Sequence, residues 1–155
     1  MSIGPGSPSK PIAWDEAREV VSIVLVASAL MVVLAPFVRY LADGSRFGPA
    51  DTVSSLLTGV GPVSGVLLVG SALLIATTPS DDVVPALRSS VTLISALVAA
   101  GGALAILLEA TSATVDQSPG FLVRLSAISA RGVPGTLLAG LAAWLARSVV
   151  PFPRN

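Results

Sequence analysis

The stretch LTGVGPVSGVLLVG at residues 57–70 places four glycines and a proline among valines and leucines. Gly59, Gly61 and Gly65 allow two interpretations: a loop that binds phosphate, or points where two membrane helices approach closely. A phosphate-binding P-loop needs a lysine directly after its last glycine, because that amine contacts the β and γ phosphates. Here Val66 follows the last glycine. The dinucleotide pattern G-x-G-x-x-G also fails, because the third glycine lies one residue too far along. The glycines therefore predict helix packing and no nucleotide.

The composition indicates a membrane environment. Of the 155 residues, 53% are hydrophobic and only 12% are charged, and the mean hydropathy is +0.86. A soluble domain has roughly 25% charged residues, because water must solvate its surface. A soluble bundle with buried helices is the alternative, and its helices would show a polar stripe. Residues 91–108 are instead apolar all round, apart from small serines and threonines whose hydroxyls can bond to the helix backbone.

Long windows without charge alternate with polar connections along the chain. They cover residues 20–38, 52–80, 89–108 and 132–146. A helix needs about 20 apolar residues to cross a bilayer core of about 30 Å. The last window reaches that length only if the Arg147 side chain extends to the headgroup region. The sequence predicts an all-α fold, a four-helix transmembrane bundle with spans at about 18–41, 61–78, 85–108 and 133–150.

Short amphipathic segments precede the second and fourth spans. Apolar side chains recur at i, i+3, i+4 and i+7 in residues 51–60, and Phe121, Leu122, Leu125 and Ile128 lie on one face of residues 121–131. Glycines and prolines at 59–62 and 132–135 follow them. We therefore expect a short interfacial helix and then a change of direction at both places. The common order of the two halves fits either an ancient duplication or convergent hairpin design.

The remaining segments complete the predicted organisation. Residues 1–13 are rich in Gly, Ser and Pro and are expected to form a flexible tail, whereas residues 14–155 form a single membrane domain. Residues 109–120 are expected to be a solvated loop. The first apolar segment is preceded by acidic residues and continues past its Ala-Ser-Ala sequence, so we expect it to remain in the mature protein and not to be cleaved as a signal peptide.

Small residues spaced four apart identify candidate helix-packing faces. This spacing removes side-chain bulk from one helix face and lets another backbone approach, which matters in lipid because burial there supplies little driving force between helices. The candidates are Gly61 and Gly65 in the second span, Ser95, Ala99 and Ala103 in the third, and Gly135, Ala139 and Ala143 in the fourth.

Membrane-interface anchors are expected near the ends of the spans. Tryptophan and tyrosine favour the headgroup level, where the ring is half buried and its polar atom is wet. Trp14, Tyr40 and Trp144 fit this role, and Arg147 can extend to the same level. No aromatic residue lies at the centre of a span, so the sequence gives no indication of a stacked cofactor.

Residues that carry chemistry are scarce. The chain has no cysteine and no histidine, which argues against disulfides, zinc sites and histidine-ligated haem, and the one lysine lies in the tail. We predict no catalytic residue, no metal and no cofactor. Glu109, Arg124 and Arg131 are candidates for lipid or ion contact near the bilayer surface. Arginines 46 and 88 are further candidates for contact with anionic lipid headgroups.

These observations favour a non-catalytic membrane protein, an accessory subunit of a larger bacterial inner-membrane complex such as a respiratory or other energy-transducing assembly. Its expected partners are other integral membrane subunits and membrane lipids, with no nucleic acid. The preference for arginine over lysine, with abundant Ala, Val and Gly, is typical of GC-rich bacterial genomes. Arginines are almost evenly divided between the two sides, and the longer loops on one side favour cytoplasmic termini. The alternative is a small homo-oligomeric transporter or lipid-binding membrane protein.

Overall fold

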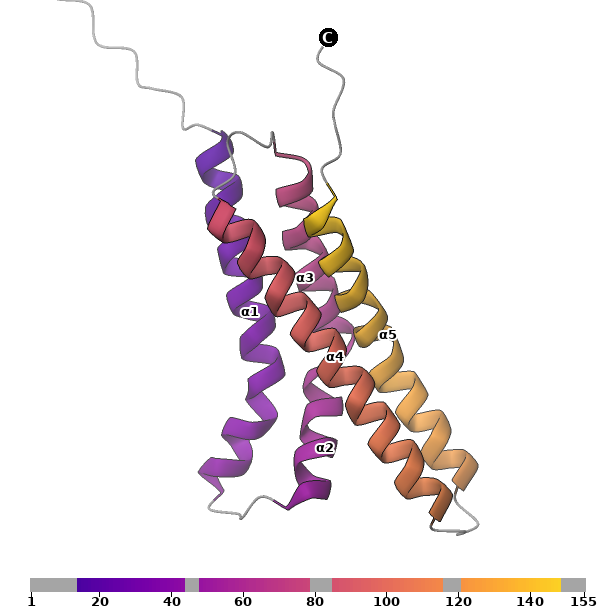
Figure 1. Ribbon diagram of the computed structural model, residues 1–155. Helices are drawn as coiled ribbons and strands as arrows, with labels where there is room; N and C mark the ends of the chain where they lie inside the picture. The colour runs from indigo at the N-terminus through magenta and orange to yellow at the C-terminus, as the bar shows by residue number, and fades with distance from the viewer. Residues whose placement is uncertain (1–13, 44–47, 79–84, 116–120, 149–155) are drawn as a thin grey trace, which may run out of the picture.

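The computed structural model describes residues 14–43, 48–78, 85–115 and 121–148. The described residues form five helices and no strand: α1 (Trp14–Ala42), α2 (Pro49–Gly59), α3 (Pro62–Ala76), α4 (Pro85–Val115) and α5 (Phe121–Arg147). Figure 1 shows an elongated bundle in which α1, the α2–α3 pair, α4 and α5 run between the same two ends. The predicted tail over residues 1–13 lies outside the described residues.

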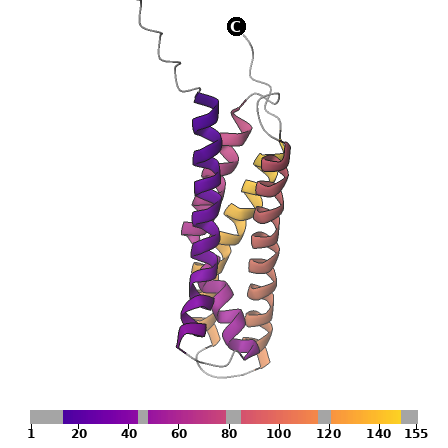
Figure 2. The same ribbon diagram turned by 90° about the vertical axis from the view of Figure 1, so that its left-hand side faces the viewer.

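The bundle has two packed halves that meet along α3. The α1 helix packs on α2 and α3, whereas α4 and α5 form an antiparallel pair and α5 also packs on α3. Figure 2 shows α1 (indigo) and α4 (salmon) as separate helices along opposite edges of the view. The central helix is therefore α3, whose buried residues include Leu68, Ala72 and Ile75.

The helix breaks between α2 and α3, where the sequence predicts a change of direction. Val60 (φ −82°, ψ 53°) and Gly61 (φ −91°, ψ −178°) leave the helical region, and Pro62 begins α3. Proline suits the first helical turn because its missing N–H would have no partner there. The two helices meet at a bend of 49°, and α2 continues the course of α3 along the bundle (Figure 1).

Two predicted breaks are wrong. The segment over 121–131 is not a separate short helix before the fourth span, because α5 runs without interruption from Phe121 to Arg147 through Pro134. Likewise, the expected loop over 109–120 is helical as far as Val115. A proline inside a helix costs one backbone hydrogen bond, which packing can offset. Here α5 packs on α3 and α4, and that contact keeps the helix continuous.

Two of the described helices are long and apolar enough to cross a membrane, not four. They are Ala17–Ala42 in α1 and Pro85–Thr111 in α4, and the bent α2–α3 pair gives a third if it forms one span. The uncharged stretch of α5 covers only residues 132–146, or about 22 Å at 1.5 Å per residue. That is shorter than a bilayer core of about 30 Å.

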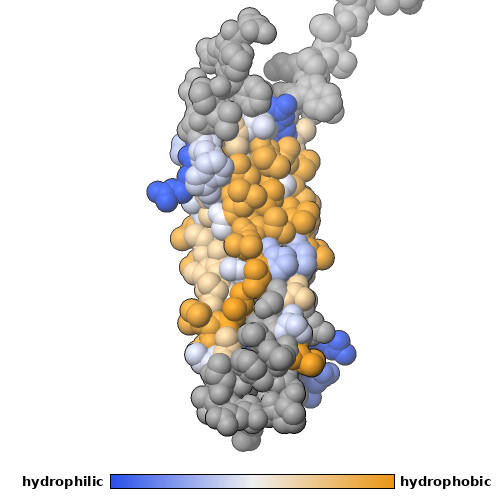
Figure 3. Space-filling view, turned by 90° about the vertical axis from the view of Figure 1, so that its right-hand side faces the viewer, coloured by the Kyte–Doolittle hydropathy of each residue, from blue (hydrophilic) through white to orange (hydrophobic). Residues whose placement is uncertain are grey.

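The outer surface of the bundle is apolar. Only 22% of the span in α1 and 28% of the span in α4 is buried. Figure 3 shows hydrophobic residues over the middle of one face and hydrophilic residues toward its two ends. Large apolar side chains that are at least 60% exposed occur on four helices: Val20, Met31, Val38, Leu41, Val63, Leu93, Leu97, Leu107, Val123, Leu137 and Trp144. Because lipid solvates such side chains and water does not, the structure is that of a membrane protein.

Glycines allow the closest contacts at the helix break. A Cβ on Gly59 would overlap the backbone carbonyl of Val33 in α1. A Cβ on Gly135 in α5 would overlap the carbonyl oxygen of Val60 and lie 2.6 Å from that of Gly61. Since the backbone angles at the break do not require glycine, these glycines are needed for space. The break is thus enclosed between α1 on one side and α5 on the other.

We predict that Gly135→Ala destabilises the bundle. The added methyl group would meet backbone carbonyls that cannot rotate away, and overpacking of this kind costs about 1–3 kcal/mol. Gly140→Ala is the matched control, because it lies in the same helix, is exposed and has no atom within 4 Å of an added Cβ. The control should gain up to about 1 kcal/mol of helix propensity. Reversible unfolding in mixed micelles measures both, and equal effects would contradict close packing at Gly135.

Candidate functional site

Three of the predicted packing residues meet where α3 crosses α5. A Cβ on Gly65 would lie 2.6 Å from Leu138 Cβ and 3.1 Å from the Gly135 carbonyl oxygen. Gly61 is the N-cap of α3, and its carbonyl lies against Gly135. Glycines from both helices therefore place two backbones in direct contact, the arrangement that stabilises helix pairs in lipid.

The other predicted packing residues occupy different positions around their helices. Ala139 is fully buried against the core, and Ser95 in α4 is also fully buried. Ala99 and Ala143 are partly buried. Ala103 is exposed on the outer side of α4. The strict four-residue spacing thus begins on the packed face and leaves it within two turns.

A heptad-like spacing describes the packed faces better. Alternating steps of four and three residues keep side chains on one face of a helix, whereas repeated steps of four turn about 40° each time. The buried residues of α4 follow that alternation: Val91, Ser95, Val98, Gly102 and Ala105. The buried residues of α5 follow the same alternation and are all glycine or alanine: Gly132, Gly135, Ala139, Ala142 and Ala146. The sequence carries this signal, and counting heptads would have found Gly102, Gly132, Ala142 and Ala146.

The polar residues that are buried among the described part of the chain carry hydroxyl groups, and the Nε atom of partly buried Arg88 is also enclosed. Ser22 Oγ in α1 and Ser71 Oγ in α3 are 2.6 Å apart, and Ser71 Oγ also donates to the Ser22 carbonyl at 3.2 Å. Ser64 Oγ donates to the Gly61 carbonyl at 2.9 Å, next to the helix break. Among the described residues, those classed as buried include no charged side chain. These contacts connect helices and caps, and they do not titrate in the physiological range.

Charged candidates lie toward the end of the bundle where α4 joins α5. Glu109 is partly buried on α4, two residues before the end of the apolar span at Thr111. The backbones of Arg124 and Arg131 lie in the first half of α5, and their side chains are outside the described part. Within the described residues, no three histidine, cysteine or acidic side chains form a group that could hold a metal ion.

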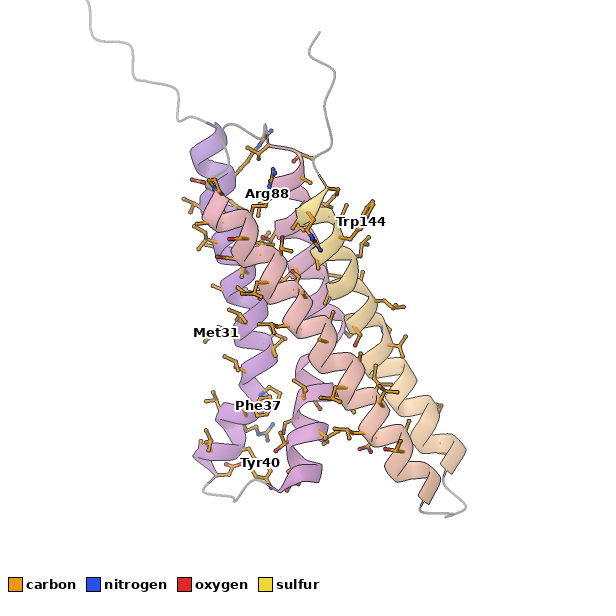
Figure 4. All side chains as sticks on the ribbon, in the orientation of Figure 1. Met31, Phe37, Tyr40, Arg88 and Trp144 are labelled. Atoms are coloured by element: carbon orange, nitrogen blue, oxygen red, sulfur yellow. The ribbon has the colours of Figure 1, made fainter. Side chains whose placement is uncertain are left out.

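The interface anchors lie near opposite ends of the molecule. Figure 4 shows Tyr40 near one end and Trp144 toward the other. The Tyr40 hydroxyl hydrogen bonds with the Asp51 carboxylate, which also accepts the Gly48 N–H at 3.2 Å, so α1 is tied to the start of α2. Trp144 is 64% exposed. Arg147 is exposed at the last residue of α5, and Trp14 begins α1 with its side chain outside the described part.

An open groove of about 750 Å³ lies beside the first turns of α4. Arg88 of α4 and Arg147 of α5 are the two charged residues that line it within the described part of the chain. Sequence reasoning treated these arginines separately, one as a headgroup contact and the other as an anchor. Folding brings them to the same groove because α4 and α5 are antiparallel, so the start of one helix lies beside the end of the other (Figure 1).

Comparison of the chain with protein-family models, with curated proteins and with solved structures finds no match.

We predict that Ser22 and Ser71 are energetically coupled. Hydrogen bonds between membrane helices contribute about 0.6 kcal/mol on average in double-mutant cycles. The variants Ser22→Ala, Ser71→Ala and their combination should give a coupling energy of about that size in unfolding experiments in micelles. Ser22 paired with Ser64 in a second cycle is the control, because no hydrogen bond joins these two side chains. A coupling energy of zero in the first cycle would contradict the contact.

Proposed function

We propose that the chain is a non-catalytic accessory subunit of a larger membrane complex and acts by helix-to-helix adhesion. The observation that carries the proposal is the difference between the packed helix faces of the bundle and its outer helix faces. The packed faces combine small residues and hydroxyls with a few larger side chains such as Leu68 and Val91, whereas the outer faces of α1 and α4 expose large apolar side chains along most of their length. Such a molecule offers shape and contact area to neighbours in the bilayer.

The outer face of α4 supports contact with a second membrane protein. Ala96, Ala100 and Ala103 are all exposed on it, beside the exposed side chains of Leu97 and Leu104. Ala96 and Ala100, four residues apart, let the backbone of a partner helix approach, and the leucines beside them supply dispersion contacts. This face is outside the heptad-like face that α4 uses against α5.

The favoured host is a bacterial inner-membrane assembly of the respiratory or another energy-transducing type. Support comes from the arginine-rich, lysine-poor composition and from the small share of the chain that lies outside apolar segments. In this proposal α5 provides a fourth span, because Arg147 and the adjacent Trp144 extend it to the headgroup level. Both termini then lie on the cytoplasmic side.

We predict a topology with four crossings, which the absence of natural cysteine makes simple to test. Single cysteines at Ser9 and Ser80 should react with a membrane-impermeant maleimide from the cytoplasmic side. Single cysteines at Ser45 and Ser118 should react from the opposite side. Reaction of Ser118→Cys and Ser80→Cys from the same side would contradict a crossing by α4, and a C-terminal cysteine on the side of Ser118→Cys would contradict a crossing by α5.

We predict that a tagged copy, purified in mild detergent at native expression level, retains a stoichiometric membrane-protein partner. Ala100→Trp should reduce the amount of recovered partner at least tenfold, because the indole fills the space beside the exposed alanines of α4 that the partner helix would occupy. Ala35→Trp is the matched control, since Ala35 is an exposed alanine in the outer part of α1. Both variants should keep wild-type helix content by circular dichroism.

The alternative is a small transporter or lipid-binding protein that works as a homo-oligomer. The broken helix α2–α3 favours it, because interrupted membrane helices often form ion and substrate sites in transporters. The contacts at the break weigh against it: Val60 is fully buried and Gly135 packs on the carbonyls that such a site would use. A monodisperse homo-oligomer without a partner would contradict the adhesion proposal and favour this alternative.

A further inference from the structure

The groove beside α4 combines positive charge with an apolar wall. Among the described residues its lining consists of Pro85, Arg88, Ser89, Ser90, Thr92, Leu93, Ala96 and Arg147, none of which is acidic. Two arginines from different helices therefore line one space of about 750 Å³, a volume typical of small-molecule sites.

Arg88 has unused hydrogen-bonding capacity in this groove. Its Nε atom is buried and has no hydrogen-bond partner among the described residues. A buried donor of this kind costs free energy unless a partner satisfies it. Guanidinium groups bind phosphate oxygens through two parallel N–H bonds, which makes a phosphate a well-matched partner.

The position of the groove favours a lipid as the source of that phosphate. It begins at Pro85, where the apolar span of α4 also begins. Trp144, one turn before Arg147, is exposed at the same end of the molecule as Arg88 (Figure 4). Exposed Leu93, which lines the groove, and exposed Leu97 continue from it toward the middle of the bundle. A headgroup can therefore lie at the arginines while an acyl chain follows the leucines.

The hydroxyls of the lining indicate which headgroup fits. Ser89 Oγ and Ser90 Oγ donate to the Ala86 carbonyl at 3.0 and 2.7 Å, and Thr92 Oγ1 donates to the Arg88 carbonyl at 2.8 Å. Because these protons are committed to the helix backbone, each oxygen has only acceptor capacity left for a ligand. A headgroup that carries hydroxyl donors, such as glycerol, matches them.

We propose that this groove binds an anionic glycerophospholipid of the phosphatidylglycerol class. Arg88 and Arg147 hold the phosphate, the hydroxyls of Ser89 and Thr92 accept from the glycerol headgroup, and one acyl chain lies against Leu93. This site goes beyond the accessory role, because it forms within a single copy of the chain and needs no partner protein.

The test is lipid binding to the full-length protein in detergent, measured by native mass spectrometry during titration with phosphatidylglycerol or phosphatidylcholine of equal chain length. We expect saturable binding of one phosphatidylglycerol, at least tenfold tighter than phosphatidylcholine. Arg88→Gln and Arg147→Gln should each weaken it about tenfold, or about 1.4 kcal/mol. Arg88→Lys should give an intermediate loss, because it keeps the charge and loses the two-bond geometry.

Matched controls keep the inference falsifiable. Arg39→Gln removes an exposed arginine from the last turn of α1, at the other end of the bundle, and should leave binding unchanged. An equal loss in that variant, or equal binding of the two lipids, would overturn the site. Soluble glycerol phosphate that displaces the lipid at the same concentration would overturn the lipid assignment. Binding that appears only in the Asp81→Asn/Asp82→Asn variant would mean that the protein's own carboxylates occupy the groove, and would also overturn it.

Discussion

The contact between Gly135 and the carbonyls of Val60 and Gly61 is the constraint on which the rest of the bundle depends. In lipid, burial of apolar surface supplies little force between helices, so cohesion comes from dispersion at short range and from satisfied backbone groups. A methyl group at position 135 would separate α5 from the break in the α2–α3 rod. Val33 meets the same break from the α1 side through Gly59. The break between α2 and α3 is thus also a point of close contact with α1 and α5.

This constraint distributes residue types through the molecule. The buried face of α5 consists of glycine and alanine, whereas the buried face of α4 alternates small residues with Val91 and Val98, and most of the larger side chains of α1 and α4 are exposed. Some buried hydroxyls bond to one another or to carbonyls, as Ser22 and Ser71 do, whereas Ser95 Oγ and Thr136 Oγ1 are buried without a hydrogen-bond partner among the described residues. Charged residues lie toward the ends of the helices. The proposed accessory role and the proposed lipid site at Arg88 and Arg147 both depend on recognition at the surface of the bundle.

Much of this fold is predictable from local sequence. Charge-free windows predict α1 and α4, and the sequence GVGP at residues 59–62 predicts the break, because glycine and proline act on the backbone within one turn. The same reasoning fails at Pro134, where α5 continues because contacts with α3 and α4 outweigh one lost hydrogen bond. The helix through Val115 was missed for a related reason, since a polar composition does not reveal that a neighbouring helix extends alongside it.

The sequence by itself determined the environment, the helical class, the absence of cysteine and histidine, and the small residues available for packing. These properties depend on side-chain chemistry and on spacing within one helix. Only the tertiary structure decided which small residues touch: Ala103 faces outward, whereas Gly102 beside it packs against Val60 and Thr136. It also brought Arg88 and Arg147 to one groove. Residues so far apart in the chain meet only when antiparallel helices pack, and that pairing is a property of the whole bundle.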